Sequence, residues 1–205
     1  MKKETSIRPW VGLEELEIVQ IIDETPDIKS FRFKRIDGEL FPEFKPGQFL
    51  SFQIKEDKKT SRSYSLSSIP QNKGILQVSI KKIDGGVGSS WFHGLKIGDR
   101  VKAFSPSGHF VENQESGAES VYIAGGVGIT PILSMILSNL ESAVSRKMVL
   151  FYGARTESDL AFGKLLDFYA SGDERFSYYP ILSQTTDGEG DKGYLTMEYI
   201  QSKIQ

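Results

Sequence analysis

The chain changes its hydrophobic period between residues 112 and 118, and this change constrains the fold more than any other feature of the sequence. Before it, short runs of β-branched and aromatic residues alternate with turns rich in Gly, Pro and Asn, which is typical of antiparallel strands. After it, strand-like apolar runs alternate with helical patterns, which is typical of a parallel sheet with right-handed crossovers. The sequence therefore predicts a six-stranded antiparallel β-barrel at 10–112 and an α/β parallel-sheet domain at 118–205, joined by an acidic linker at 112–119.

The individual elements follow from the same two periods. In the barrel we expect strands at 16–22, 28–33, 48–54, 62–65, 76–83 and 100–104, with one short helical segment at 89–95. In the second domain we expect strands at 121–124, 148–152 and 176–182, and helices at 130–141, 157–169 and 197–204. Pro131 is expected at the first position of its helix, where proline is favoured.

The composition excludes several classes of chemistry. Among 205 residues there is no cysteine, and the two histidines, His93 and His109, are expected to be packing or surface residues. Disulfides, thiolate zinc sites and cysteine nucleophiles are therefore excluded, and no metal site is expected. The net charge of -2, without a basic stripe, argues against binding of nucleic acid. No segment is long and apolar enough to span a membrane or to act as an export signal, so we expect a cytoplasmic protein.

The first motif is the run Arg62, Ser63, Tyr64 and Ser65. Arginine offers a planar donor fork to a phosphate, tyrosine offers a face for stacking, and serine offers a short donor for a ring heteroatom. In a strand, Arg62 and Tyr64 point to one face of the sheet and the serines point to the other. A plain exposed strand with a cross-strand tyrosine is the alternative interpretation of these four residues.

The second motif is the glycine-rich stretch at 84–90, which ends in Gly88, Ser89 and Ser90. Glycines let backbone N–H groups turn toward a ligand, and serines begin helices, so together they favour an anion site at a helix N-terminus. A hairpin loop is the alternative.

The third motif, Gly125 to Pro131, lies between a predicted buried strand and a predicted helix. Its Gly-x-Gly core matches the turns that hold phosphates in nucleotide-binding folds. Pro131 stands where the dinucleotide fingerprint has its third glycine, and the following strand ends at Arg155 instead of an acidic residue.

Taken in this order, the three motifs resemble the ferredoxin reductase superfamily, above all the reductase modules of ring-hydroxylating oxygenases and the flavohaemoglobins. The segments that carry the resemblance lie between about residues 46 and 155; they are 62–65, 88–90, 98–101, 105–110, 125–131 and 152–155.

The resemblance implies FAD as cofactor and NADH or NADPH as substrate. The residues implied to bind FAD are Arg62, Ser63, Tyr64, Ser65, Val78, Ser79, Ile80, Lys81, Gly88, Ser89, Ser90 and Thr130. Those implied to bind the nicotinamide nucleotide are Gly126, Gly128, Ile129, Pro131, Arg155, Ser183 and Gln184. Tyr64, Ser65 and Thr130 are implied to contact the reacting rings. Relatives that use NADPH have a Ser-Arg pair where this chain has Ser183 and Gln184, which favours NADH slightly.

By the same resemblance the chain is expected to transfer hydride from NAD(P)H to FAD. Single electrons would then pass to an acceptor protein, such as a ferredoxin, a haem protein or an oxygenase, or to a small molecule. Relatives continue into a further strand and helix, so the α/β domain is expected to be incomplete, either as a truncated molecule or as a natural short form. The alternative is a flavin-binding electron-transfer subunit or sensor without nicotinamide turnover.

Overall fold

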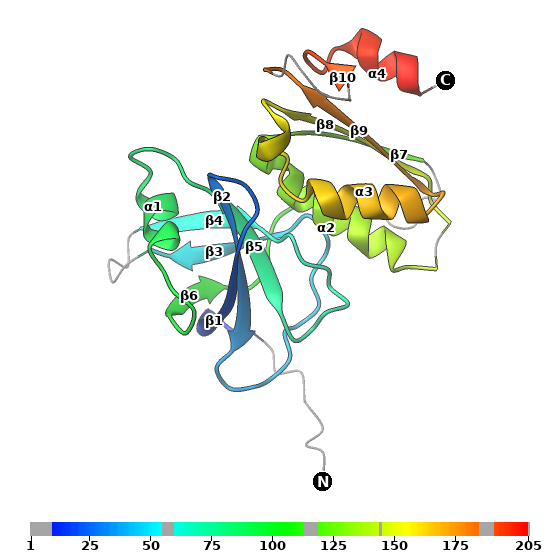
Figure 1. The fold of residues 1–205 in the computed structure, drawn as a ribbon. Coiled ribbons are helices and arrows are strands. Elements are labelled where there is room, and N and C mark those ends of the chain that lie inside the picture. Colours follow the sequence, from blue (N-terminus) through cyan, green and yellow to red (C-terminus); the bar gives the residue numbers. More distant parts are fainter. Residues whose placement is uncertain (1–9, 55–59, 113–118, 144, 185–190, 205) are drawn as a thin grey trace. The chain divides into compact units, whose positions relative to one another are not determined.

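The computed structural model describes residues 10–54, 60–112, 119–143, 145–184 and 191–204, which form two compact units. The first unit contains an antiparallel sheet together with residues 130–138, and the second contains a parallel sheet with the remaining helices. Figure 1 shows the order of the elements along the chain. The predicted linker at 112–119 lies largely outside the described residues. No helix in the described parts of the chain is long and apolar enough to cross a membrane.

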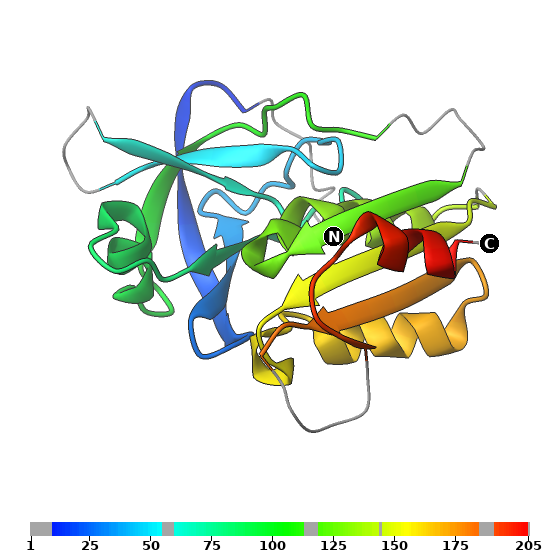
Figure 2. The ribbon, with the colours of Figure 1, turned by 90° about the horizontal axis from the view of Figure 1, so that it is seen from above.

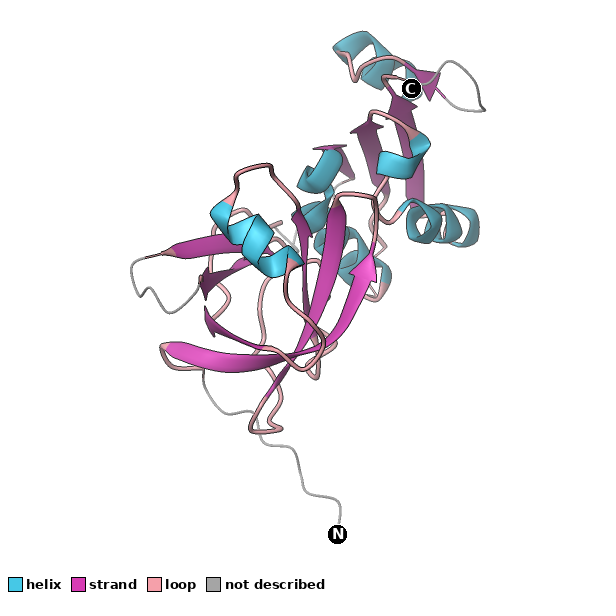
Figure 3. Cartoon of the chain, turned by 60° about the vertical axis from the view of Figure 1, so that its left-hand side comes forward, coloured by secondary structure: helices cyan, strands magenta, loops and turns pink. Residues whose placement is uncertain are grey.

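The sheet of the first unit has six strands in the order β4-β3-β6-β1-β2-β5, and every neighbouring pair is antiparallel. The strands are β1 (Leu13–Asp23), β2 (Ile28–Arg35), β3 (Phe49–Gln53), β4 (Ser61–Ser65), β5 (Leu76–Lys81) and β6 (Arg100–Phe104). An isolated antiparallel bridge between Leu66 and Val78 connects the ends of the strand order, since Leu66 follows β4 and Val78 lies in β5. The curved sheet is seen in Figure 3, and it confirms the predicted six-stranded antiparallel barrel.

Alternating apolar residues of these strands fill one core. Leu16, Ile18 and Phe52 are fully buried, as is Phe92 from the short helix α1 (Val87–His93). The Phe92 ring contacts four other aromatic rings, with centroid distances of 4.9–5.3 Å. Helix α1 is the helical segment expected at 89–95, and its apolar side closes the barrel core.

The sheet of the second unit is parallel throughout, in the order β10-β9-β8-β7. Its strands are β7 (Ser120–Gly125), β8 (Met148–Ala154), β9 (Phe176–Leu182) and β10 (Asp191–Lys192). The parallel sheet confirms the predicted α/β class, and Figure 2 shows its strands side by side. The expected number of three strands is wrong, because β10 adds a fourth. A polar strand of 2 residues has no hydrophobic period to detect.

The helices are η1 (Gly126–Gly128), α2 (Ile129–Leu140), η2 (Glu157–Asp159), α3 (Gly163–Gly172) and α4 (Met197–Lys203). Two expectations need correction. Pro131 is the third residue of α2, because the chain already turns helically through η1. The single helix expected at 157–169 is divided, because Phe162 adopts a left-handed conformation with φ of 63° that interrupts helical hydrogen bonding.

Helix α2 is attached to the loop that follows β4. The Ser134 hydroxyl donates to the Ser68 carbonyl at 2.6 Å, and the Gln71 side-chain amide donates to Ser138 Oγ at 3.2 Å. These bonds explain why residues 130–138 group with the antiparallel sheet.

Candidate functional site

The first two sequence motifs meet where helix α1 packs on strand β4. A Cβ atom at Gly88 would lie 2.6 Å from Tyr64 Oη and 2.7 Å from Arg62 Cγ, so only glycine allows this approach. Arg62 and Ser63 are exposed, and Tyr64 is half-buried. The motif of β4 and the glycine–serine turn, which are separate in the sequence, therefore form one surface.

Tyr64 presents an aromatic ring that the core holds in place. Its ring lies edge-on against Phe92, with centroids 5.3 Å apart, and tilted against Phe52 at 6.2 Å. Burial raises the pKa of the Tyr64 hydroxyl, and the nearby Arg62 charge opposes this only in part. The phenol therefore stays protonated at neutral pH. A neutral, half-exposed ring on a rigid support suits stacking with a flat cofactor.

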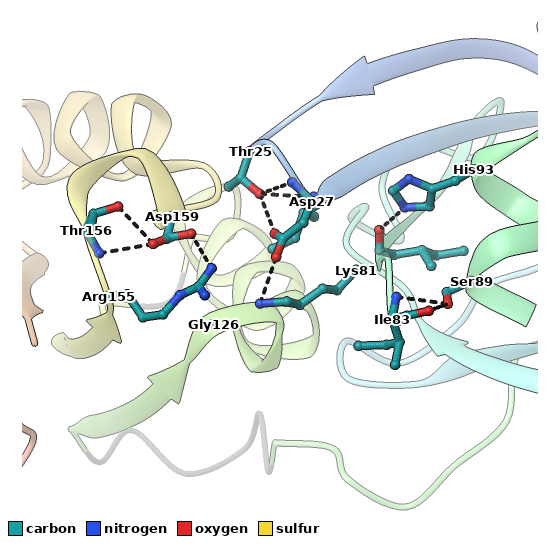
Figure 4. A network of polar contacts seen from close by, with 12 residues as sticks. Thr25, Asp27, Lys81, Ile83, Ser89, His93, Gly126, Arg155, Thr156 and Asp159 are labelled. Carbon is teal, nitrogen blue, oxygen red and sulfur yellow. Dashed lines mark hydrogen bonds and ion pairs between the residues drawn. The ribbon is translucent and has the colours of Figure 1, made fainter. Parts of the chain in front are cut away.

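The residues expected on β5 contribute in different ways. Val78 and Ile80 point into the core and are buried, so only their backbone is available to a ligand. The Ser79 hydroxyl is buried too, within 2.8 Å of the Ser30 and Ser67 hydroxyls. Lys81 is partly exposed and pairs with Asp27 at 3.1 Å, as Figure 4 shows.

The residues expected on α1 also differ from one another. Ser89 is buried, and its hydroxyl accepts a hydrogen bond from the Ile83 N–H at 3.1 Å, which fastens the preceding turn (Figure 4). Its side chain is therefore structural, whereas Ser90 is exposed. His93 hydrogen-bonds to the Ile80 carbonyl at 2.9 Å and packs against Phe31, so it is a packing residue.

The third motif forms an open turn at the carboxyl end of β7. Gly126 has φ of 50°, a left-handed conformation that favours glycine. A Cβ atom added at Gly125, Gly126 or Gly128 would meet nothing within 4 Å. The open space leaves the backbone of a helix N-terminus accessible, which is the arrangement that binds pyrophosphate. Ile129 and Thr130 are buried, and Pro131 is partly exposed.

Arg155, Ser183 and Gln184 come together at the carboxyl ends of β8 and β9. The Ser183 N–H donates to the Ala154 carbonyl at 3.0 Å, and the Gln184 N–H donates to the Arg155 carbonyl at 2.8 Å. The Arg155 side chain is 55% exposed and pairs with Asp159 at 2.8 Å.

Asp159 is held as an anion beside Arg155. Burial alone would raise its pKa, but hydrogen bonds from Thr156 and Arg155 outweigh burial, so the pKa of the Asp159 carboxyl is lowered. The Thr156 hydroxyl donates to Asp159 at 2.8 Å (Figure 4). Asp159 is not among the residues predicted from the sequence, because its pairing with Arg155 depends on the turn between β8 and η2 and not on a helical pattern.

Two family models match the chain and together cover most of it. The Oxidoreductase FAD-binding domain matches residues 15–111, and the Oxidoreductase NAD-binding domain matches residues 122–205. The fold and these two matches therefore define a chain with one FAD-binding and one NAD-binding domain of the oxidoreductase type. The chain belongs to the ferredoxin reductase superfamily, as the motifs predicted, and the expected cofactors are confirmed by the same two matches.

Individual relatives agree with this family. The chain is 37% identical over 170 residues to a Flavohemoprotein of Candida albicans, covering 80% of this chain and 42% of that protein. It is 29% identical over 183 residues to Ferredoxin--NADP reductase B of Sorangium cellulosum, covering 88% and 75%. Among solved structures, the Amycolatopsis cytochrome P450 reductase GcoB matches with a TM-score of 0.81 and 25% identity, over 95% of this chain and 60% of that one. The chain spans about half the length of most curated relatives that it matches.

Proposed function

We propose that this chain transfers a hydride from a nicotinamide nucleotide to FAD and passes single electrons on to an acceptor. The observation that carries the proposal is the close packing of Gly88 on Arg62 and Tyr64. It places a cation, an aromatic ring and a glycine–serine turn on one surface, which are the groups that a flavin dinucleotide requires. FAD, when bound, supplies the redox chemistry, because it accepts an electron pair and releases electrons singly.

In this proposal the residues of the chain bind FAD and the nicotinamide nucleotide and orient their rings. The Arg62 guanidinium holds phosphate oxygens, the Tyr64 ring packs against the flavin ring system, and the Ser65 hydroxyl donates toward the reactive edge of that ring. Backbone groups of the turn at 125–131 hold the pyrophosphate of the nicotinamide nucleotide, and Thr130 lies near its ring. No side chain has to act as an acid or base, which suits a chain with two histidines and no cysteine.

We propose NADH, rather than NADPH, as the electron donor. Arg155, a cation at this edge of the sheet that could meet a 2′-phosphate, is already paired with the Asp159 carboxylate. Gln184, which follows β9, carries no charge. An extra phosphate would meet the negative Asp159 and would have to displace it from Arg155. These charges support a preference for the unphosphorylated ribose.

The proposed acceptor is a protein with a haem or an iron–sulfur centre. Relatives are named as a phenol monooxygenase reductase component, a glycine betaine monooxygenase reductase subunit and flavohemoproteins. These names support a protein acceptor for this chain, which itself has no cysteine to ligate an iron–sulfur cluster.

The test begins with purified protein saturated with FAD under anaerobic conditions. Adding NADH should bleach the oxidised-flavin absorbance within seconds, and NADPH should act more slowly. Arg62→Ala should abolish tight FAD binding, whereas Arg100→Ala should not, because Arg100 is an exposed arginine of β6 that pairs with Glu15. Tight FAD binding without bleaching by either nucleotide would support an electron-transfer subunit without turnover, and no FAD binding would refute both functions.

A further inference from the structure

Tyr152 is a buried residue near the end of β8 that the proposed chemistry does not use. Its side chain is 0% exposed, and its hydroxyl donates to the Gly126 carbonyl at 3.0 Å. The same hydroxyl receives a backbone hydrogen bond from Ala161. Burial strongly raises the pKa of this phenol, so the hydroxyl keeps its proton at neutral pH.

The two hydrogen-bond partners of the Tyr152 hydroxyl lie in two different segments of the proposed nucleotide site. Gly126 begins the open glycine turn at the end of β7, and Ala161 follows the segment in which Asp159 pairs with Arg155. One hydroxyl therefore connects the turn proposed for the pyrophosphate with the segment proposed for the adenosine ribose. Both segments lie at the carboxyl edge of the same parallel sheet, where nucleotides bind in such folds.

The glycine turn needs a hydrogen bond from outside to fix its conformation, because its own glycines have no side chains that could do so. Gly125, Gly126 and Gly128 have no side chains, and the space around their Cα atoms is open. Glycine has the largest conformational freedom of all residues, so a free turn would lose much entropy on binding a ligand. Since the peptide unit is planar, fixing the Gly126 carbonyl also fixes the plane of the peptide bond that follows it.

We infer that Tyr152 is a positioning residue that preorganises the nucleotide site through the Gly126 carbonyl. The inference rests on the proposed binding of a nicotinamide nucleotide at this turn. It assigns the hydroxyl to nucleotide affinity and not to hydride transfer or FAD binding, because the hydroxyl bonds to the Gly126 carbonyl and to the Ala161 backbone, both in the second unit.

Tyr152→Phe tests the inference by removing one oxygen atom and keeping the ring. Tyr178→Phe is the matched control, because the Tyr178 hydroxyl lies buried in β9 of the same sheet and has no hydrogen-bond partner among the described residues. In FAD-saturated protein, Tyr152→Phe should weaken NAD⁺ binding by calorimetry and raise the KM for NADH, each by about tenfold, as expected for a lost buried hydrogen bond. The kcat and the FAD affinity should stay within twofold of wild type, and Tyr178→Phe should match wild type throughout.

A second readout does not depend on turnover. Amide hydrogen exchange at residues 126–129 should be faster in Tyr152→Phe than in Tyr178→Phe, with or without FAD.

Equal nucleotide affinity in Tyr152→Phe and wild type, or a loss confined to kcat, would overturn the inference. If Tyr152→Phe fails to fold, Gly126→Ala, which perturbs the same turn, must raise the KM for NADH without changing the kcat; otherwise the inference is wrong. Failure of wild type to bind NAD⁺ or NADH at all would instead refute the proposed function.

Discussion

Replacing Gly88 by alanine should damage the surface on which β4 and α1 meet. The added Cβ atom would lie 2.6 Å from Tyr64 Oη and 2.7 Å from Arg62 Cγ. Arg62 can swing away, but the Tyr64 ring is held by Phe92 and Phe52, so either the ring or the helix has to shift. The change therefore affects the ring proposed to stack on the flavin and the cation proposed to bind phosphate at once.

The magnitude follows from two opposing terms. Alanine in place of glycine within a helix normally stabilises by about 1 kcal/mol. Overpacking at a tight contact costs about 1–3 kcal/mol, so we expect a net destabilisation of about 1 kcal/mol. For a domain of this size that lowers the Tm by about 4–8 °C. A shift of the Tyr64 ring and the Arg62 side chain should weaken FAD binding by at least about tenfold, which corresponds to about 1.4 kcal/mol.

Thermal unfolding of the FAD-free protein and FAD titration measure these two effects separately. Gly94→Ala is the control, because Gly94 at the end of the same helix has an ordinary φ of -88° and the nearest atom to an added Cβ is the Trp91 carbonyl oxygen, at 3.4 Å. It should leave the Tm within about 2 °C and the FAD affinity unchanged, since it introduces neither backbone strain nor severe overlap. The reasoning is wrong if Gly88→Ala raises the Tm and binds FAD as tightly as wild type.

Three further predictions concern the ion pair, the core and a half-buried acid. Asp159→Asn should raise the kcat/KM for NADPH relative to NADH by about three- to tenfold, because Arg155 becomes available to a phosphate; an unchanged ratio in steady-state assays would contradict the proposed donor preference. Phe92→Ala should destabilise the first unit by about 3–5 kcal/mol in denaturant unfolding, and a loss below about 1 kcal/mol would show that its aromatic contacts contribute little. Glu24 has a pKa raised by burial, which its hydrogen bond from Ser30 only partly offsets, so its ionisation opposes folding and its own contribution to stability falls as the pH rises above about 4.5. The Tm of Glu24→Gln should therefore rise relative to that of wild type between pH 4 and 6, and a Tm difference that does not change with pH would contradict this.

The spacing of apolar residues predicts the kind of sheet in each unit, because that spacing reflects which side chains are buried. In β5, the alternation of Val78 and Ile80 toward the core is visible as apolar residues at every second position. Strands β7 and β8 are nearly continuous apolar runs, which is typical of a parallel sheet. The expectation that the strand at 121–124 is fully buried is wrong, because Val121 and Ile123 lie on an exposed face of β7. Strand β10 escapes detection because it consists of two polar residues, Asp191 and Lys192, which carry no hydrophobic period. The break before α3 depends on the non-helical backbone of Leu160 and Phe162, whose side chains give no local signal of it.

In the candidate site, too, some residues can be predicted from the sequence and others are seen only in the structure. Motifs single out Arg62, Tyr64 and the open glycine turn as candidates, because these residue types suit a ligand with phosphates and a flat ring. Motifs do not distinguish Ser89, whose hydroxyl is used inside the turn, from the exposed Ser90. They also do not show the hydrogen bond from Tyr152 to Gly126, because it joins strand β8 to the turn that follows β7 and depends on tertiary packing.

The glycines of the two units are required for opposite reasons, and one further substitution separates these reasons. Gly88 is needed because other protein atoms are close, whereas an added Cβ atom at Gly128 would meet nothing within 4 Å. Gly128→Ala should therefore leave the Tm unchanged or raise it, since alanine favours helical backbone by up to about 1 kcal/mol. The same methyl group would occupy space that a pyrophosphate needs, so NAD⁺ binding measured by calorimetry should weaken by about tenfold or more. The affinity for FAD should not change. Gly172→Ala, at an equally open position at the end of α3, should leave the affinities for both NAD⁺ and FAD unchanged. If Gly128→Ala binds NAD⁺ as wild type does, the open turn is not where the nucleotide binds, and the conformation of Gly126 would need another explanation.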